Sequence, residues 1–152
     1  ERTWHGDTNG YIYNHNIGDS YDYGGAASNI TASYQTPNLD FGDVGTKKTM
    51  RYVRVSVSPE GGIQPTLRVR YDYEDPLIAQ PLDYILDSIP LPSIFGSGIF
   101  GTNVFGATPD PLVRQAIQGS GHTVSFIITS SDTNSPYTIN GLYVDYTPSG
   151  RR

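Results

Sequence analysis

The sequence predicts an all-β fold, an antiparallel β-sandwich of the jelly-roll type, and three observations support this prediction. The 152 residues include 17 glycines, 11 prolines and 12 tyrosines, with a single methionine. Strand-favouring valine, isoleucine, threonine and tyrosine are common, whereas helix formers are scarce. Apolar and polar residues alternate in several short segments that glycine- and proline-rich turns separate. No helices are expected between these strands, so a parallel sheet is not expected either.

The N-terminal third predicts two strands. Residues 10–15 are expected to form a first short strand, which leads into an aromatic and acidic loop at residues 18–25. Residues 29–35 alternate Ile30, Ala32 and Tyr34 with polar neighbours, which is typical of a half-buried strand. Residues 37–45 carry glycine and aspartate at turn positions.

The middle and C-terminal segments predict two β-hairpins. Residues 50–57 and 66–73 both alternate, and the turn sequence SPEGG lies between them. Residues 112–118 and 123–129 are expected to form a second hairpin around residues 119–121, with three inward side chains: Val124, Phe126 and Ile128.

A last strand is expected at residues 137–146. Its inward side chains are Ile139, Leu142, Val144 and Tyr146. This alternation slips by one residue at Asn140-Gly141, where glycine is typical of a β-bulge.

One segment interrupts the strands of this single domain (residues 1–152), a long apolar loop insertion at residues 76–109. Its first part has the spacing of a short helix, through Leu82, Ile85, Leu86 and Ile89. A repeat of period five follows: Ile94-Phe95-Gly96, Ile99-Phe100-Gly101 and Val104-Phe105-Gly106. Two interpretations stay open, closure of one end of the sandwich or packing on a neighbouring subunit. Deletion of residues 93–106 would unfold the domain in the first case and disturb assembly in the second.

The chemistry of the chain argues against an enzyme and predicts no cofactor. Cysteine is absent, so thiol nucleophiles, disulfides and cysteine metal sites are excluded. The histidines His5, His15 and His122 lie in separate contexts without metal-ligand spacing, and Ser120-Gly121-His122 is not a catalytic triad. Asp72, Glu74 and Asp75 cluster after a strand, and other acidic residues lie near turns: Asp19, Asp22, Asp40 and Asp43. Turn capping is favoured for them over a structural cation or a glycosidase pair.

Charge and apolar patterning limit the partners. The formal net charge is −5, so no basic field attracts nucleic acid. No apolar run approaches the roughly 18 residues of a membrane span.

Tyrosines supply the strongest binding-like feature. Tyr11, Tyr13, Tyr21 and Tyr23 suit a sheet surface, a protein interface or a sugar platform. Together with the apolar repeat they form the candidate interface: Tyr11, Tyr13, Tyr21, Tyr23, Ile94, Phe95, Ile99, Phe100, Val104 and Phe105. The alternative is a carbohydrate-binding module that uses the tyrosine-rich loop.

Four stretches in order cover nearly the whole chain: GYIY with YDYG, YQTPNLDFGD, the repeated Phe-Gly segment, and GSGHTVSF followed by INGLYVDY and the terminal GRR. This set resembles the C-terminal β-domain of tail structural proteins of short-tailed phages, such as tail nozzle (tubular) and stabilisation proteins. Such proteins often carry Trp-Gly where this chain has Phe-Gly.

The resemblance implies a non-catalytic ring component of a phage tail. Its implied partners are other copies of itself and neighbouring tail proteins, in a virion assembled in the bacterial host cytoplasm. Because the only methionine is Met50, we expect the chain to be part of a longer protein.

Overall fold

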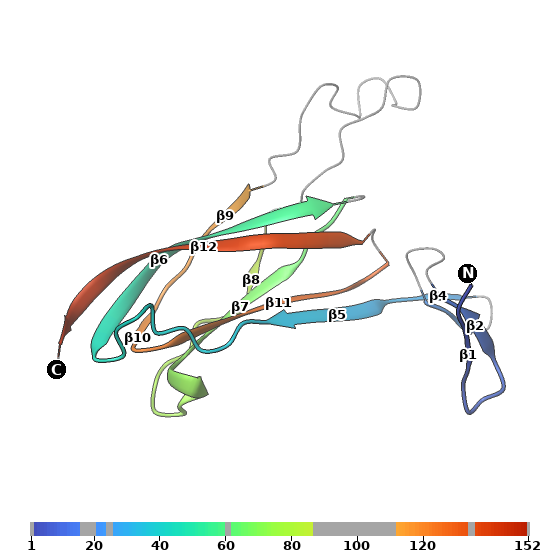
Figure 1. The fold of residues 1–152 in the computed structure, drawn as a ribbon, viewed down its shortest axis with the longest axis horizontal. Helices are drawn as coiled ribbons and strands as arrows, with labels where there is room; N and C mark the ends of the chain where they lie inside the picture. The colour runs from blue at the N-terminus through green and yellow to red at the C-terminus, as the bar shows by residue number, and fades with distance from the viewer. Residues whose placement is uncertain are drawn as a thin grey trace, which may run out of the picture.

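Two four-stranded antiparallel sheets lie face to face (Figure 1). The computed structural model describes residues 2–15, 21–23, 26–59, 62–86, 112–133 and 136–151. The strands are β1 (Trp4–Gly6), β2 (Ile12–Asn14), β3 (Tyr21–Tyr23), β4 (Ala26–Ser28), β5 (Ile30–Gln35), β6 (Thr46–Pro59), β7 (Thr66–Tyr71), β8 (Tyr84–Ile85), β9 (Leu112–Ala116), β10 (Ser120–Gly121), β11 (Val124–Asp132) and β12 (Tyr137–Arg151), with a 3-10 turn at Asp72–Glu74. Within the described residues, no helix is long and apolar enough to span a membrane.

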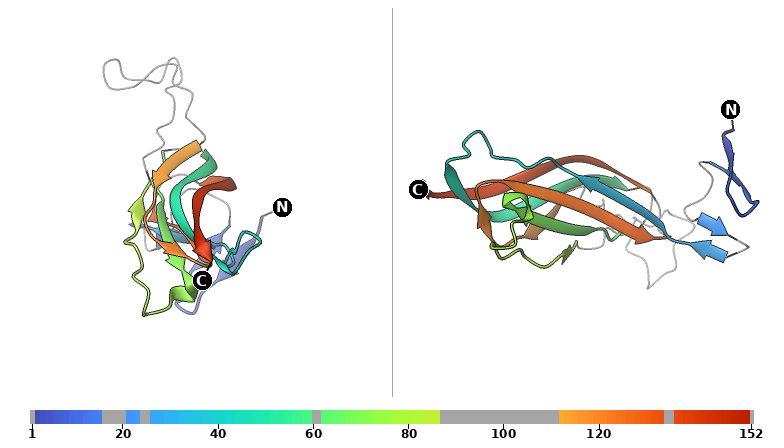
Figure 2. Two further views of the ribbon diagram at one scale, coloured as in Figure 1. Left: turned by 90° about the vertical axis from the view of Figure 1, so that its left-hand side faces the viewer. Right: turned by 90° about the horizontal axis from the view of Figure 1, so that it is seen from below.

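The predicted all-β antiparallel sandwich is confirmed, while its jelly-roll topology stays a prediction. One sheet has the order β5-β11-β7-β8. In the other sheet β6 lies at the centre, with β12 along one side and β9 and β10 along the other. Two small hairpins, β1–β2 and β3–β4, precede β5 along the chain (Figure 2).

The core lies between the two sheets and follows the alternation of the strands. Every second residue of a strand points to the same face, so one face of β6, β7 and β11 is buried. The fully or almost fully buried side chains are Val53, Val55 and Val57 of β6, Leu67, Val69 and Tyr71 of β7, and Val124, Phe126 and Ile128 of β11. The inward triad predicted for β11 is therefore confirmed.

Register shifts keep the inward face of β6 and β12 continuous. Ile139 is opposite Val57 and Gly141 is opposite Ser56, so Asn140 is the extra residue of the bulge predicted there. A second shift leaves Arg51 as the extra residue of β6, which is why Met50 and Val53 are both buried although three positions apart.

Both predicted hairpins are wrong, because their strands belong to different sheets. β6 pairs with β9, β10 and β12, whereas β7 pairs with β8 and β11. Residues 62–65 lead into β7 of the opposite sheet, and Ile63 and Pro65 are buried there. Likewise β9 pairs with β6, while β11 pairs with β5 and β7. Alternation determines which side chains face inward, but strands that face each other across a sandwich satisfy the same pattern as strands that pair.

Three local predictions also need correction. The strand predicted at residues 10–15 is present as β2, although β1 precedes it in the chain. Part of the loop predicted at residues 18–25 is wrong, because residues 21–23 form strand β3. β5 is exposed along its whole length instead of half-buried. Residues 84–85 form β8 where a short helix was expected, and Leu82 is exposed.

The end of β5 is fixed to β11 by a buried threonine. The Thr36 backbone N–H donates to the Phe126 carbonyl at 2.9 Å, and the Phe126 N–H donates to Thr36 Oγ1 at 3.0 Å. The Ser125 hydroxyl donates to the Thr36 carbonyl at 2.8 Å. The Thr36 side chain thus accepts the hydrogen bond that a strand carbonyl would otherwise accept.

Thr36→Val is expected to destabilise the domain by about 1–3 kcal/mol, because it leaves the buried Phe126 N–H without an acceptor. The measurement is urea unfolding. Thr31→Val is the matched control, since the Thr31 hydroxyl contacts Ser131 on an exposed surface and its loss should change stability by less than about 0.5 kcal/mol. Equal midpoints for the two variants would contradict the assigned role of Thr36.

A small ion-pair network holds residues 80–85 against the outer face of β7. The Arg68 guanidinium donates to both oxygens of Asp83, from Nε at 2.9 Å and from Nη2 at 2.6 Å. Arg70 contacts the same carboxylate at 3.5 Å and Glu74 at 3.2 Å. The hydrogen bond between Arg68 and Asp83 holds the pKa of the Asp83 carboxyl below its usual value. The same hydrogen bond raises the pKa of the Arg68 guanidinium.

Because the folded-state pKa of Asp83 is lowered, its contribution to stability is present above the unfolded-state value of about 3.9 and is lost as the pH falls through the folded value. Asp83→Asn should therefore cost at most about 1 kcal/mol at pH 7, since the pair is partly exposed and salt screens it. The cost should vanish in acid. Urea unfolding of the unmodified chain and of Asp83→Asn, from pH 7 into acid, measures this cost. A cost that does not change with pH would contradict the prediction.

Candidate interaction site

The sandwich is open along one side, where the edge strands β5 and β12 border an apolar groove. The groove has a volume of about 720 Å³. Its apolar residues include Leu39 and Phe41 from the segment after β5, Ile128 of β11, and Ile139, Leu142 and Val144 of β12. No charged side chain is among its described lining residues. The groove explains why Tyr34, a lining residue on the inward side of β5, is 49% exposed.

Both strands that border the groove are unprotected edges. Among the described residues, β5 pairs only with β11, and β12 pairs only with β6. Natural edge strands usually carry charges or proline, which prevent another strand from pairing with them. β5 has neither, and β12 has neither from residue 137 to residue 144, with Asp145 and Pro148 beyond. The unprotected stretch of each strand is therefore the stretch that borders the groove.

An aromatic pair lies at one end of the groove. The rings of Phe41 and Tyr146 stack with their centroids 4.8 Å apart. Phe41 has a φ of 52°, an uncommon value for a non-glycine residue. Asp40 stabilises this turn, because its Oδ1 accepts the Gly42 N–H at 2.9 Å. The turn predicted at residues 37–45 therefore positions one lining residue.

The β1–β2 hairpin projects away from the sandwich beyond the start of β5, as Figures 1 and 2 both show. Asp7 organises its turn by accepting the N–H groups of Asn9 and Tyr11 at 2.9 and 3.0 Å and the Tyr13 hydroxyl at 3.1 Å. The Tyr11 hydrogen bond is the largest cause that lowers the pKa of Asp7. Gly10 completes the turn with a φ of 88°.

One face of this hairpin is polar and aromatic. His5 is directly opposite Tyr13 in the register, and their rings stack at 5.0 Å. His5 Nδ1 and His15 Nε2 are 2.6 Å apart, so the prediction that these histidines lie in separate contexts is wrong. The Asn9-Gly10 pair, a strong hairpin signal between alternating residues, could have shown that residues 5 and 15 come together. Within the described residues no group of three or more histidine, cysteine, aspartate or glutamate side chains is placed to hold a metal ion.

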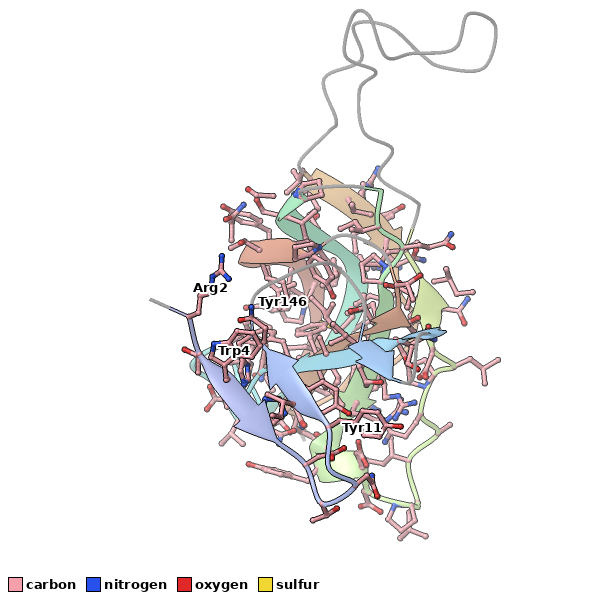
Figure 3. The ribbon with its side chains drawn as sticks, turned by 90° about the vertical axis from the view of Figure 1, so that its right-hand side faces the viewer. Arg2, Trp4, Tyr11 and Tyr146 are labelled. Atoms are coloured by element: carbon pink, nitrogen blue, oxygen red, sulfur yellow. The ribbon has the colours of Figure 1, made fainter. Side chains whose placement is uncertain are left out.

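The other face of the hairpin is apolar and exposed. Trp4 is opposite Asn14 and Ile12 is opposite Gly6, so Trp4 and Ile12 share this face. Trp4 is 56% exposed and Ile12 is 74% exposed. Figure 3 shows Trp4 on β1 and Tyr11 just before β2, in front of the sandwich.

The predicted interface residues are only partly placed. The structure brings Tyr11 and Tyr13 together on the hairpin, with their ring centroids 6.5 Å apart. Tyr21 and Tyr23 lie in β3, but their side chains fall outside the described residues, as does the whole apolar repeat: Ile94, Phe95, Ile99, Phe100, Val104 and Phe105. The groove was not predicted. The signal that could have revealed it is the absence of charge and proline from two strands, each expected to have one polar face.

The acidic turn after β7 has a structural partner. Asp72 Oδ1 accepts the N–H groups of His122 and Thr123 at 2.7 and 2.8 Å, which ties this turn to the start of β11. Nearby, the buried ammonium of Lys48 donates to the carbonyl oxygens of Asp43 and His122. These contacts favour the turn-capping interpretation of Asp72.

A search of protein-family models, curated proteins and solved structures finds no match for this chain.

Proposed function

We propose that this chain is a structural domain of a bacteriophage tail, of the nozzle or hub type, that joins subunits and has no catalytic role. The observation that carries the proposal is the uncharged apolar groove between two unprotected edge strands. The cores of protein interfaces are depleted in charged residues and enriched in aromatic ones. The sequence resemblance to phage tail domains supports the virion setting.

Two surfaces would serve this role. The groove offers apolar side chains together with unpaired backbone groups, a combination that suits an added strand or hairpin. The exposed Trp4 and Ile12 offer an apolar face on a projecting element. The proposed partners are other copies of the chain and neighbouring tail proteins, including adaptors and fibres.

Immunogold labelling of purified phage particles tests the proposal, with an antibody raised against this domain. We expect gold at the tail, and we expect antibody pre-absorbed with the pure domain to give none. An antibody against a known tail protein is the positive control. Particles that carry the control label but not the domain label would contradict the proposal.

A further inference from the structure

We propose that the groove between β5 and β12 receives the β1–β2 hairpin of a second copy of the chain, with Trp4 and Ile12 facing the groove. The inference rests on the proposed function in one respect, that the partner is another subunit of the same ring. It adds which two surfaces meet and how successive subunits are joined.

The two surfaces match in chemistry. The paired residues of the hairpin face are two large apolar side chains, with Gly6 and Asn14 between them, and none of these four is charged. The described groove lining is uncharged as well. The nearest carboxylate of the hairpin, Asp7, lies in the turn and already accepts three hydrogen bonds from the hairpin itself. Docking by this face therefore buries apolar surface without burying an unpaired charge, which would be costly.

The dimensions and the backbone also match. A side chain such as Trp4 buries about 150–250 Å² when covered, and a volume of about 720 Å³ has room for it beside Ile12. The hairpin has only two strands, so each strand has a free edge among the described residues. One of these edges can pair with the uncharged part of β12, as in other cases of strand addition.

The position of the hairpin favours a second copy over the hairpin's own groove. The hairpin precedes β5, one wall of the groove, and it stands beyond the end of the sandwich (Figure 2). In a head-to-tail arrangement, the hairpin of each subunit would reach the groove of the next. Two different surfaces then meet at every contact, and this geometry closes into a ring when the rotation between subunits permits.

The chain contains one tryptophan, Trp4, so its fluorescence reports directly on the hairpin. For the full chain, sedimentation velocity over a concentration series should show association. Over the same range, Trp4 emission should shift to shorter wavelength and its quenching by acrylamide should fall.

Two defective variants provide the decisive test. Trp4→Ala removes the hairpin anchor and leaves the groove intact, whereas Leu142→Glu places a charge in the groove and leaves Trp4 intact. Each variant alone should weaken association by about tenfold or more. Mixed together they should form a one-to-one dimer, because one supplies the groove and the other the hairpin, and the Trp4 emission of the Leu142→Glu chain should shift.

Further variants show whether a loss of association comes from the groove or from misfolding. Tyr34→Glu charges the opposite wall at a half-exposed position and should act like Leu142→Glu. Leu77→Glu is the matched control, because Leu77 is 92% exposed and is not a lining residue of the groove. It should associate as the unmodified chain does. Circular dichroism checks that each variant is folded.

Three results would overturn the inference. The first is a chain that stays monomeric at its highest attainable concentration. The second is a monomer whose Trp4 is already protected, which would place the hairpin in its own groove. The third is association that folded Leu142→Glu and Tyr34→Glu chains retain. A monomeric chain that still labels the phage tail would refute this inference alone, whereas an associating chain absent from particles would refute only the proposed function.

Discussion

Gly119→Ala is expected to lower the free energy of unfolding by about 2–5 kcal/mol, a large part of the 5–15 kcal/mol typical of a domain. Gly119 has a φ of 109°, where a side chain costs about 1–2 kcal/mol. A Cβ atom there would lie 2.4 Å from Cε2 of Tyr71, and such overpacking typically costs about 1–3 kcal/mol more.

The neighbouring tyrosine has little freedom to move away. Tyr71 is fully buried, and its hydroxyl donates to the Gln118 carbonyl at 2.8 Å. Burial also raises the pKa of this hydroxyl, so it remains a donor to higher pH than an exposed tyrosine would. The ring is therefore held against the Gly119 backbone by packing and by a hydrogen bond to the preceding residue. Relief of the clash would have to shift β7 or the loop before β10.

Two other glycines separate backbone strain from the clash. Gly150 has a φ of 79° with open space around it, so Gly150→Ala should cost only the strain, about 1–2 kcal/mol. Gly62 has neither a positive φ nor a neighbour within 4 Å, so Gly62→Ala should be near neutral. Urea unfolding midpoints of the three variants give the comparison. Equal losses for Gly119→Ala and Gly150→Ala would show that Tyr71 does not restrict this position.

The inward faces of the strands could be predicted from the sequence, but the pairing of the strands could not. Alternation identified Val124, Phe126 and Ile128 as core residues, because successive side chains of a strand point to opposite faces of the sheet. The bulge at Asn140-Gly141 could be predicted because the alternation itself slips there. Pairing depends on which strands lie side by side across the whole chain, and a short turn such as residues 58–62 favours a hairpin locally. The observed pairing, of β6 with β12 and of β7 with β11, excludes the hairpin.

The candidate site was harder to predict, for a related reason. Residues of β5 alternate as a half-buried strand would, yet Ile30 and Tyr34 are half-exposed, because no described strand of the opposite sheet covers them. An apolar residue in a strand shows that burial is favourable, but it does not show whether the same chain provides the cover. The tyrosines Tyr11 and Tyr13 could be assigned to one face by their spacing, whereas the contact of His5 with His15 required the hairpin register.

Phe126→Ala is expected to be similarly damaging, with a loss of about 3–5 kcal/mol, because Phe126 is fully buried between the sheets and its truncation leaves a cavity. Leu142→Ala removes an apolar side chain of β12 that lines the open groove and is only partly buried. Solvent can fill the space left there, so the loss in the monomer should stay below about 2 kcal/mol, under the range for core leucines.

Chemical unfolding at low protein concentration measures both variants as monomers, and sedimentation measures association. The main effect of Phe126→Ala should be a loss of stability. Leu142→Ala should lose association while keeping most of its stability. If Leu142→Ala costs the monomer as much as Phe126→Ala, the groove is covered by the chain itself in solution. Leu142 would then belong to the monomer's own core, and the groove would not be open to a second copy.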